Sequence, residues 1–269
     1  MIALVGATVL YLLSNLLLAA AWSRLLLWFG QKLPSPGVCR SIYARSQIAK
    51  YVPGNILHIA GRHMLARDAG MAHGPLALAA LYEILLLVVA ASGMTLLGWT
   101  LFGVTQANVS NLFLIAAGLG VPAIALLLAK SAPKISFLRG YELRERPMPE
   151  IVSGLAVPFS MYLMFILGAG LALLGTGYAV EGCIDVSTLG ATVSLFAVAY
   201  IAGVITPGAP SGIGIREGIL VLALAGTTGE ASALLIALLF RVVTISGDVI
   251  FFLMGFMQCR SMTKGRECQ

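Results

Sequence analysis

The amino-acid sequence predicts an all-α fold, a polytopic membrane helical bundle, and three observations lead to this fold class. Of the 269 residues, 59% are hydrophobic and only 10% are charged, whereas soluble domains carry about 25% charged residues. Long apolar stretches recur along the chain, and the basic residues are concentrated in the polar segments between them. We therefore predict a single integral membrane domain over residues 1–269, without a soluble domain.

Five apolar stretches are long enough to cross a membrane. The hydrocarbon core of a bilayer is about 30 Å thick, which takes roughly 20 residues of α-helix. The chain enters its first apolar stretch almost at once, without the basic region that begins a secretory signal peptide, so this stretch is expected to stay as a span. The predicted spans are residues 2–22, 75–102, 112–129, 151–176 and 231–257.

Two further apolar stretches, residues 41–67 and 188–226, are each interrupted by proline and glycine. The interruptions fall at residues 51–55 and 206–212. Residues 213–226 would span only about 21 Å as a helix, which favours a re-entrant hairpin over two short spans, although both give the same end topology. As hairpins, the two stretches would enter from opposite faces, and their tips would approach each other near the midplane.

The distribution of basic residues predicts the orientation in the membrane. Seven lie within residues 24–67, five within residues 130–146 and three in the C-terminal tail. The loops without any basic residue are residues 103–110, 177–187 and 227–230. By the positive-inside rule, this predicts the cytoplasmic (inner) membrane, with the loop 130–150 and the C-terminus cytoplasmic. The loop joins two pseudo-symmetric halves, residues 1–129 and 151–257, each with one interrupted stretch.

The interruptions form the predicted binding site, because unwound backbone persists in a membrane only inside protein or around an aqueous cavity. Paired interrupted segments at matching places of two halves are typical of transporters, and the freed helix N-termini suit an anionic group such as phosphate. Asn55 is placed to cap the helix after the first interruption, and Ser211 the helix from Ile213. The alternative to a binding cavity is that both interruptions are ordinary helix kinks packed by neighbouring helices. The break residues are Pro53, Gly54, Pro207, Gly208, Gly212 and Gly214.

Charged side chains inside or beside the apolar segments add to this prediction, because such residues usually face a cavity or an ionic partner. Arg216 lies one helical turn after the second interruption, where its guanidinium can hold a phosphate in bidentate fashion. Lys50, His58 and Arg62 flank the first interruption. His58 has apolar neighbours, so a packed or interfacial histidine is the alternative to a functional one.

Three further charged residues, Glu83, Arg241 and Asp248, lie within the predicted spans. Structural pairing would neutralise Glu83 with Arg62 or Arg241, and Asp248 with Arg241. The second of these pairs would need a bridge, because Arg241 and Asp248 lie two helical turns apart on one face. The alternative is a transport role, in which the carboxylates balance charge or bind an amine.

No catalytic motif accompanies these residues. The sequence contains no H-E-x-x-H, C-x-x-C or G-x-S-x-G pattern, so a transporter or membrane partner is expected rather than an enzyme; an intramembrane transferase that uses the same cavity is the alternative. The four cysteines show no paired spacing, which argues against a zinc site or a disulfide framework. We expect no metal and no cofactor. The basic pI follows from membrane topology, and nothing in the sequence suggests binding to nucleic acid.

Both interruptions carry motifs that resemble those of a known family. Residues 47–55, followed by Gly61, Arg62 and Gly70, resemble its signature K-Y-x-P-G…R…G, and residues 207–218 resemble its signature P-x-G-x-G-x-R-E. These signatures belong to the lysylphosphatidylglycerol synthase transmembrane-region family, and their order and spacing extend the resemblance over nearly the whole chain. The motif positions are occupied by Lys50, Tyr51, Pro53, Gly54, Arg62, Gly212, Gly214, Arg216 and Glu217.

The resemblance implies a flippase-like, stand-alone member that lacks the soluble synthase domain, so aminoacyl transfer is not expected. We predict a transporter in the lipid bilayer that moves a membrane lipid or polyprenyl-linked precursor with a phosphate-containing headgroup. The alternative is a non-transporting membrane subunit of a lipid or glycan transferase assembly, with a membrane or cytoplasmic transferase as its partner. The residues predicted to bind the substrate are Lys50, Tyr51, Asn55, His58, Arg62, Ser211, Arg216 and Glu217.

Overall fold

The computed structural model describes residues 1–53, 56–102, 148–182, 187–206 and 209–267, and every regular element among these residues is helical. The all-α prediction is therefore confirmed. The α-helices are α1 (Ile2–Trp28), α2 (Pro36–Gln47), α3 (Leu57–Asp68), α4 (His73–Phe102), α7 (Met148–Glu181), α8 (Ser187–Ile205), α9 (Ile215–Thr228) and α10 (Glu230–Glu267). Two short 3₁₀ helices, η1 (Ile48–Tyr51) and η5 (Pro210–Gly212), lie at the interruptions.

Four of the described helices, α1, α4, α7 and α10, are long and apolar enough to cross a membrane. They contain the predicted spans at residues 2–22, 75–102, 151–176 and 231–257, so the chain is a multi-pass membrane protein. The remaining predicted span, at residues 112–129, and almost all of the loop 130–150 lie outside the described residues.

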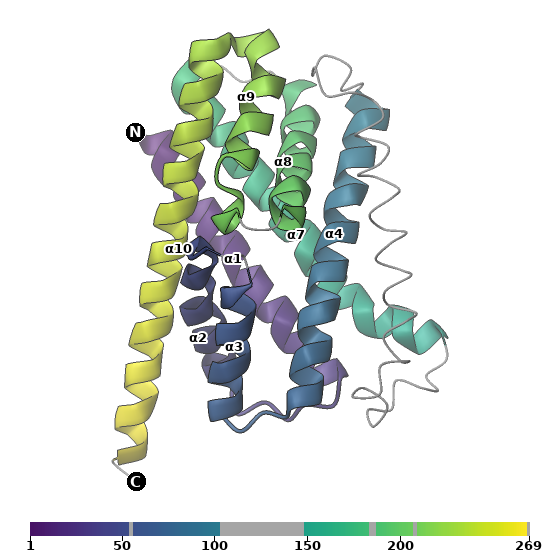
Figure 1. Cartoon of the computed structure of the whole chain (residues 1–269), viewed down its shortest axis with the longest axis vertical. Coiled ribbons are helices and arrows are strands. Elements are labelled where there is room, and N and C mark those ends of the chain that lie inside the picture. The colour runs from purple at the N-terminus through teal and green to yellow at the C-terminus, as the bar shows by residue number, and fades with distance from the viewer. Residues whose placement is uncertain (54–55, 103–147, 183–186, 207–208, 268–269) are drawn as a thin grey trace.

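The two interrupted stretches form hairpins that enter the molecule from opposite ends. The α2–η1–α3 hairpin occupies the lower half in Figure 1, and the α8–η5–α9 hairpin occupies the upper half. Their tips meet at mid-height, where η1 contacts η5. Two full spans would instead carry each tip to the opposite end of the molecule. The re-entrant arrangement expected from the sequence is therefore confirmed.

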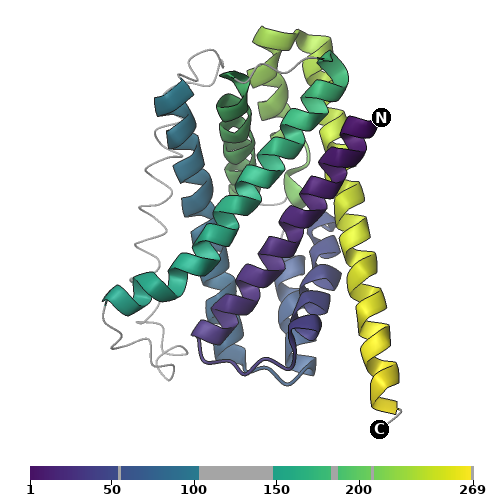
Figure 2. The same cartoon turned by 180° about the vertical axis from the view of Figure 1, so that it is seen from behind.

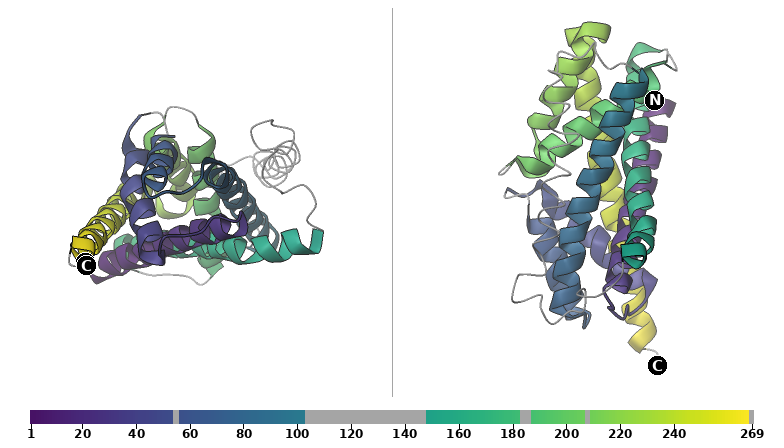
Figure 3. Two further views of the ribbon diagram at one scale, coloured as in Figure 1. Left: turned by 90° about the horizontal axis from the view of Figure 1, so that it is seen from below. Right: turned by 90° about the vertical axis from the view of Figure 1, so that its right-hand side faces the viewer.

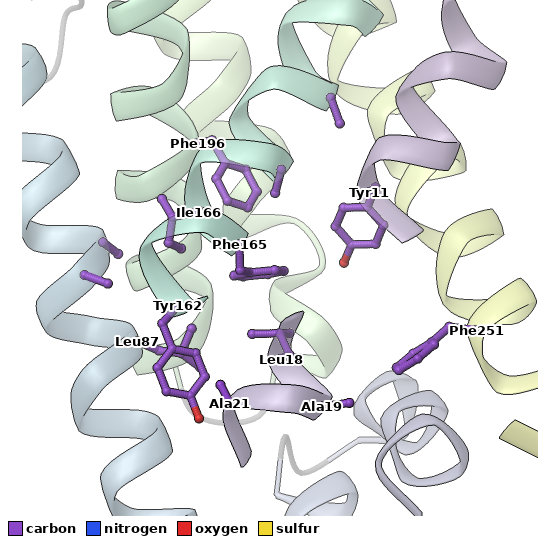
Figure 4. Close-up of a cluster of buried hydrophobic side chains, with 14 of the residues drawn as sticks. Tyr11, Leu18, Ala19, Ala21, Leu87, Tyr162, Phe165, Ile166, Phe196 and Phe251 are labelled. Atoms are coloured by element: carbon purple, nitrogen blue, oxygen red, sulfur yellow. The ribbon is translucent and has the colours of Figure 1, made fainter. Parts of the chain in front are cut away.

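The long helices form the framework around these hairpins. Helices α1 and α7 pack along each other behind the hairpins, and α4 and α10 stand on either side of them (Figures 1 and 3). The second hairpin packs against α4 and α7 through α8, and both hairpins contact α10, through α2 and α9. Figure 4 shows the resulting core, in which Leu18 of α1 lies near Phe165 of α7 and Phe196 of α8.

Local backbone chemistry explains where each hairpin breaks. Val52 is extended, with ψ 139°, as expected for the residue before a proline. At the second interruption Ser211 has φ 51°, and two glycines, Gly212 and Gly214, also have positive φ. Glycine adopts this left-handed region without a steric penalty, so the chain can reverse direction between α8 and α9.

The predicted cap on the second hairpin is wrong. Helix α9 begins at Ile215, not Ile213, and Ser211 makes no capping hydrogen bond. Ser211 instead lies inside η5 in a left-handed conformation. The Glu217 carboxylate caps α9 instead, because it accepts a hydrogen bond from the Gly214 N–H at 2.6 Å. A carboxylate in the first turn also suits the positive end of the helix dipole.

The ends of the helices agree with the predicted charge asymmetry. The end of α1, the start of α2, the end of α3 and the C-terminal end of α10 all lie at the lower end of Figure 1. These segments carry the exposed basic residues Arg24, Lys32, Arg40 and Arg67. The junction between α9 and α10, which has no basic residue, lies at the upper end.

Candidate functional site

A cavity of about 90 Å³ lies where the tips of the two hairpins meet α1 and α10. This volume has room for several water molecules. Figure 4 shows Tyr11, Leu18, Phe165 and Phe196, all of which line the cavity, on the helices that surround it. The polar part of the lining comes from both hairpins and α10, and consists of Gln47, Lys50, His58, Ser211, Arg216, Glu217, Arg241 and Thr244.

Asp248 of α10 ties the first hairpin to the framework. Its carboxylate is fully buried and lies 2.8 Å from the Lys50 Nζ. It also accepts hydrogen bonds from the Tyr51 hydroxyl and, at 3.0 Å, from the Asn15 side-chain amide of α1. Both oxygens are thus engaged, and the cation that neutralises Asp248 is Lys50 rather than Arg241, which is the partner considered from the sequence.

Arg241 of α10 connects the second hairpin to the framework, as Asp248 connects the first. Its Nη1 lies 3.3 Å from the Glu217 carboxylate and donates a hydrogen bond to the Ser211 carbonyl at 3.3 Å. Its guanidinium carbon also lies 5.4 Å from the centroid of the Tyr51 ring, which belongs to the other hairpin. Arg241 therefore links both interruptions at the centre of the molecule.

A separate buried ion pair joins Arg62 of α3 to Glu83 of α4. Tyr43 donates a hydrogen bond to the other oxygen of Glu83 at 2.7 Å, and the Arg62 guanidinium lies over the Tyr43 ring at 3.7 Å. Ser46 and Gln47 accept further hydrogen bonds from Arg62. This is the structural pairing considered from the sequence, and Arg62 is not part of the cavity lining.

Arg216 is the exception among these cations, because no carboxylate within the described part of the chain forms an ion pair with it. Its Nε is buried and has no hydrogen-bond partner there, while its guanidinium carbon lies 5.0 Å from the centroid of the Tyr200 ring. Among the described residues at the centre, three basic side chains, Lys50, Arg216 and Arg241, accompany two carboxylates, Glu217 and Asp248, which leaves one positive charge.

Two glycines shape the space that Arg216 occupies. A Cβ added to Gly203 of α8 would lie 2.5 Å from the Arg216 Nε, and one added to Gly212 would lie 2.8 Å from the Cα of Gly203. Contacts this short force neighbouring atoms to move. Glycine at both positions therefore lets α8, η5 and the arginine side chain approach each other closely.

The structure brings five of the eight predicted substrate-binding residues to the cavity. They are Lys50, His58, Ser211, Arg216 and Glu217. Tyr51 is connected to the cavity through Asp248 and Arg241, and the exposed Pro53 is not part of the lining. The predictions for Asn55, Gly54, Pro207 and Gly208 concern residues outside those that the structure describes.

Several residues of the centre escaped the sequence analysis. Asn15 could have been found from the sequence, because it is an amide within an apolar span. In the structure it is buried, and its Nδ2 donates a hydrogen bond to Asp248. Tyr11 and Tyr200 line the cavity, but aromatic residues in an apolar helix do not differ in sequence from core residues. Gly203 gave no signal, because glycine is common in transmembrane helices.

Two histidines stack at the lower end of the molecule, outside the cavity. The His63 Nε2 lies 2.9 Å from the His73 Nδ1, and the ring centroids are 5.2 Å apart. Partial burial, and then the nearby His73 and Arg67, lower the pKa of His63 below its usual value. The unfolded chain therefore binds a proton more readily than the folded chain at this position.

We expect the stability of the protein to fall as the pH drops below about 6.5, the ordinary pKa of histidine. The loss of stability increases with falling pH until the pH is below the lowered pKa of His63 in the folded protein, and it is constant below that point. His63→Asn should flatten this part of the curve, which thermal unfolding in detergent between about pH 7.5 and 5 measures. The same pH dependence in wild type and His63→Asn would contradict the assignment.

Comparison of the sequence with models of known protein families and with curated proteins gives no match.

Proposed function

We propose that the protein is a transporter that moves a lipid with a phosphate-containing headgroup across the membrane. The observation that carries this proposal is Arg216, a cation that lines the central cavity and has no carboxylate partner among the described residues. Arg216 is half-buried, a charge removed in part from water without a partner is costly, and a bound anion would neutralise it. The buried Nε of Arg216 and Nδ1 of His58 offer further unused polar atoms.

The charge balance indicates what kind of headgroup fits. Lys50 and Arg241 also line the cavity, but each already has a carboxylate within ion-pair distance. One positive charge remains, which matches the single negative charge of a phosphodiester. Arginine is well suited to this group, because its planar guanidinium donates two parallel hydrogen bonds to phosphate oxygens.

The arrangement of the hairpins supports transport rather than simple binding. Hairpins that enter from opposite ends and meet at mid-height resemble the broken helices of secondary transporters, whose sites lie near the bilayer midplane. Asp248 and Arg241 connect one hairpin each to the same long helix, α10. We propose that the hairpins rock against each other about these two contacts, and thereby open the cavity to one side at a time.

The motif resemblance to the lysylphosphatidylglycerol synthase transmembrane region agrees with this proposal. The placement of the basic segments at one end supports a location in the cytoplasmic (inner) membrane with a cytoplasmic C-terminus. No metal or cofactor is needed for the proposed function.

The test is transport of fluorescent phosphatidylglycerol in proteoliposomes that contain the full chain. We expect Arg216→Gln to reduce the initial rate about tenfold or more, because a hydrogen-bonded ionic contact contributes roughly 1.5–3 kcal/mol. Arg24→Gln, which removes an exposed arginine of α1, should transport like wild type. Thermal unfolding of each variant separates loss of transport from loss of folding.

Wild-type rates in folded Arg216→Gln would overturn the assignment of the site. Absence of transport by the wild type, together with copurification of a cytoplasmic transferase, would favour the alternative of a non-transporting membrane subunit.

A further inference from the structure

A second hollow lies on the outer surface of the lower half, away from the central cavity. It has a volume of about 460 Å³ and is formed by α1, α2 and α10. Figure 2 shows α2 between the lower parts of α1 and α10. Its apolar wall includes Leu16, Phe251, Met254 and Met257, and its polar residues are Arg40 and Gln258. We call it the α1/α2/α10 groove.

The polar residues of this groove lie at one end and the apolar residues at the other, along the direction of the membrane normal. The apolar, membrane-crossing part of α10 ends at Cys259, so Gln258 lies at its lower border. The Arg40 Nε donates a hydrogen bond to the Gln258 Oε1 at 2.9 Å. Phe251 lies seven residues earlier on α10, which is about 10 Å nearer the middle of the bilayer. The groove is therefore polar at the membrane border and apolar toward the interior.

Arg40 is available for a ligand at this border. Its side chain is exposed, and no carboxylate in the described part of the chain forms an ion pair with it. The hydrogen bond through Nε fixes one edge of the guanidinium against Gln258, and the structure gives its two terminal nitrogens no partner among the described residues. A guanidinium held in this way presents two parallel donors to a phosphate.

We propose that the α1/α2/α10 groove binds an anionic glycerophospholipid as a resident lipid, separate from the lipid that is transported. Its phosphate contacts Arg40, and one acyl chain lies along the exposed Met257 and Met254, over the buried Phe251. The charge and the order of polar and apolar residues match such a lipid, and the unbranched methionine side chains adapt to a mobile chain. The floor of the groove is tightly packed, because a Cβ on Gly255 would lie 2.7 Å from the Ala44 Cβ.

The experiment uses the full chain in phosphatidylcholine nanodiscs that contain a little phosphatidylglycerol with a photoactivatable acyl chain. After illumination, mass spectrometry locates the labelled peptides. We expect labels between residues 251 and 257 of α10. Arg40→Gln should lower this labelling about fivefold, the effect of one basic residue near a membrane surface. Arg24→Gln is the matched control and should leave the labelling unchanged.

Further arms distinguish this site from the alternatives. Met254→Trp, which narrows the groove along its apolar wall, should lower the labelling even with Arg40 intact. An excess of water-soluble glycerophosphoglycerol should not compete, and full competition would overturn the proposal in favour of a free phosphate. Arg216→Gln should leave the labelling intact. A loss of transport in this variant therefore does not affect the test of the resident lipid, and the two proposals can fail independently. Equal labelling of wild type and Arg40→Gln, or equal labelling by a phosphatidylcholine probe, would also overturn it.

Discussion

Replacing Glu83 with methionine is expected to lower the free energy of unfolding by about 3–5 kcal/mol, the usual cost of leaving a buried charge without its partner. The Arg62 guanidinium would keep its position between α2, α3 and α4 but would lose the carboxylate that neutralises it. The Tyr43 hydroxyl would lose its acceptor at the same time. The drop is measured by denaturant titration of the purified protein in detergent.

The double variant Arg62→Met, Glu83→Met gives the decisive comparison. A buried ion pair is often no more stabilising than apolar side chains of similar volume. The double variant should therefore be far more stable than the sum of the two single variants predicts. Glu181→Gln, at the exposed end of α7, serves as the control and should be neutral. Additive effects of the two substitutions would show that the pair is not coupled.

Replacing Asp248 with asparagine is the second change with a large expected effect, a loss of about 2–4 kcal/mol. Asparagine keeps the size of the side chain and can still accept one hydrogen bond. The Lys50 ammonium, however, would lose its only counter-ion among the described residues. Because Asp248 joins α1, η1 and α10, the first hairpin should also detach from the framework more easily.

Adding Lys50→Met to Asp248→Asn tests this explanation. Removal of the uncompensated ammonium should restore part of the lost stability, measured by thermal unfolding in the same detergent. Asp68→Asn, at the exposed end of α3, should have no comparable effect. If Lys50→Met instead adds its own destabilisation to that of Asp248→Asn, the ion pair does not explain the role of Asp248.

The framework could be predicted from the sequence because its determinants are local. An apolar run of about 20 residues identifies a span wherever it occurs, and α4, α7 and α10 contain the runs expected. The interruption before Pro53 was also visible, since proline restricts the residue that precedes it. Even so, α1 continues to Trp28, past the apolar run that identified it, because a helix does not end where hydrophobicity ends.

The Arg62–Glu83 pair was one of those considered from the sequence, but the partners of Asp248 and Arg241 could not be predicted, because they depend on which segments pack together. Asp248 and Arg241 lie two helical turns apart on one helix, and the pairing considered from the sequence joined them to each other through a bridge. In the structure the first hairpin brings Lys50 to Asp248, while the second brings Glu217 to Arg241. Because Lys50 and Arg241 pair with these two carboxylates, Arg216 has no ion-pair partner among the described residues. No local pattern in the sequence predicts this lack of a partner.

The contact between Tyr51 and Asp248 also constrains how the protein is made. The two residues are separated by 197 positions in the chain. At the usual rate of synthesis, roughly 5–20 residues per second, the first hairpin waits on the order of 10–40 s for its partner helix. During this interval Lys50 is an unneutralised cation at the tip of an incomplete hairpin. Lys50 therefore stays without its counter-ion until α10 has emerged from the ribosome.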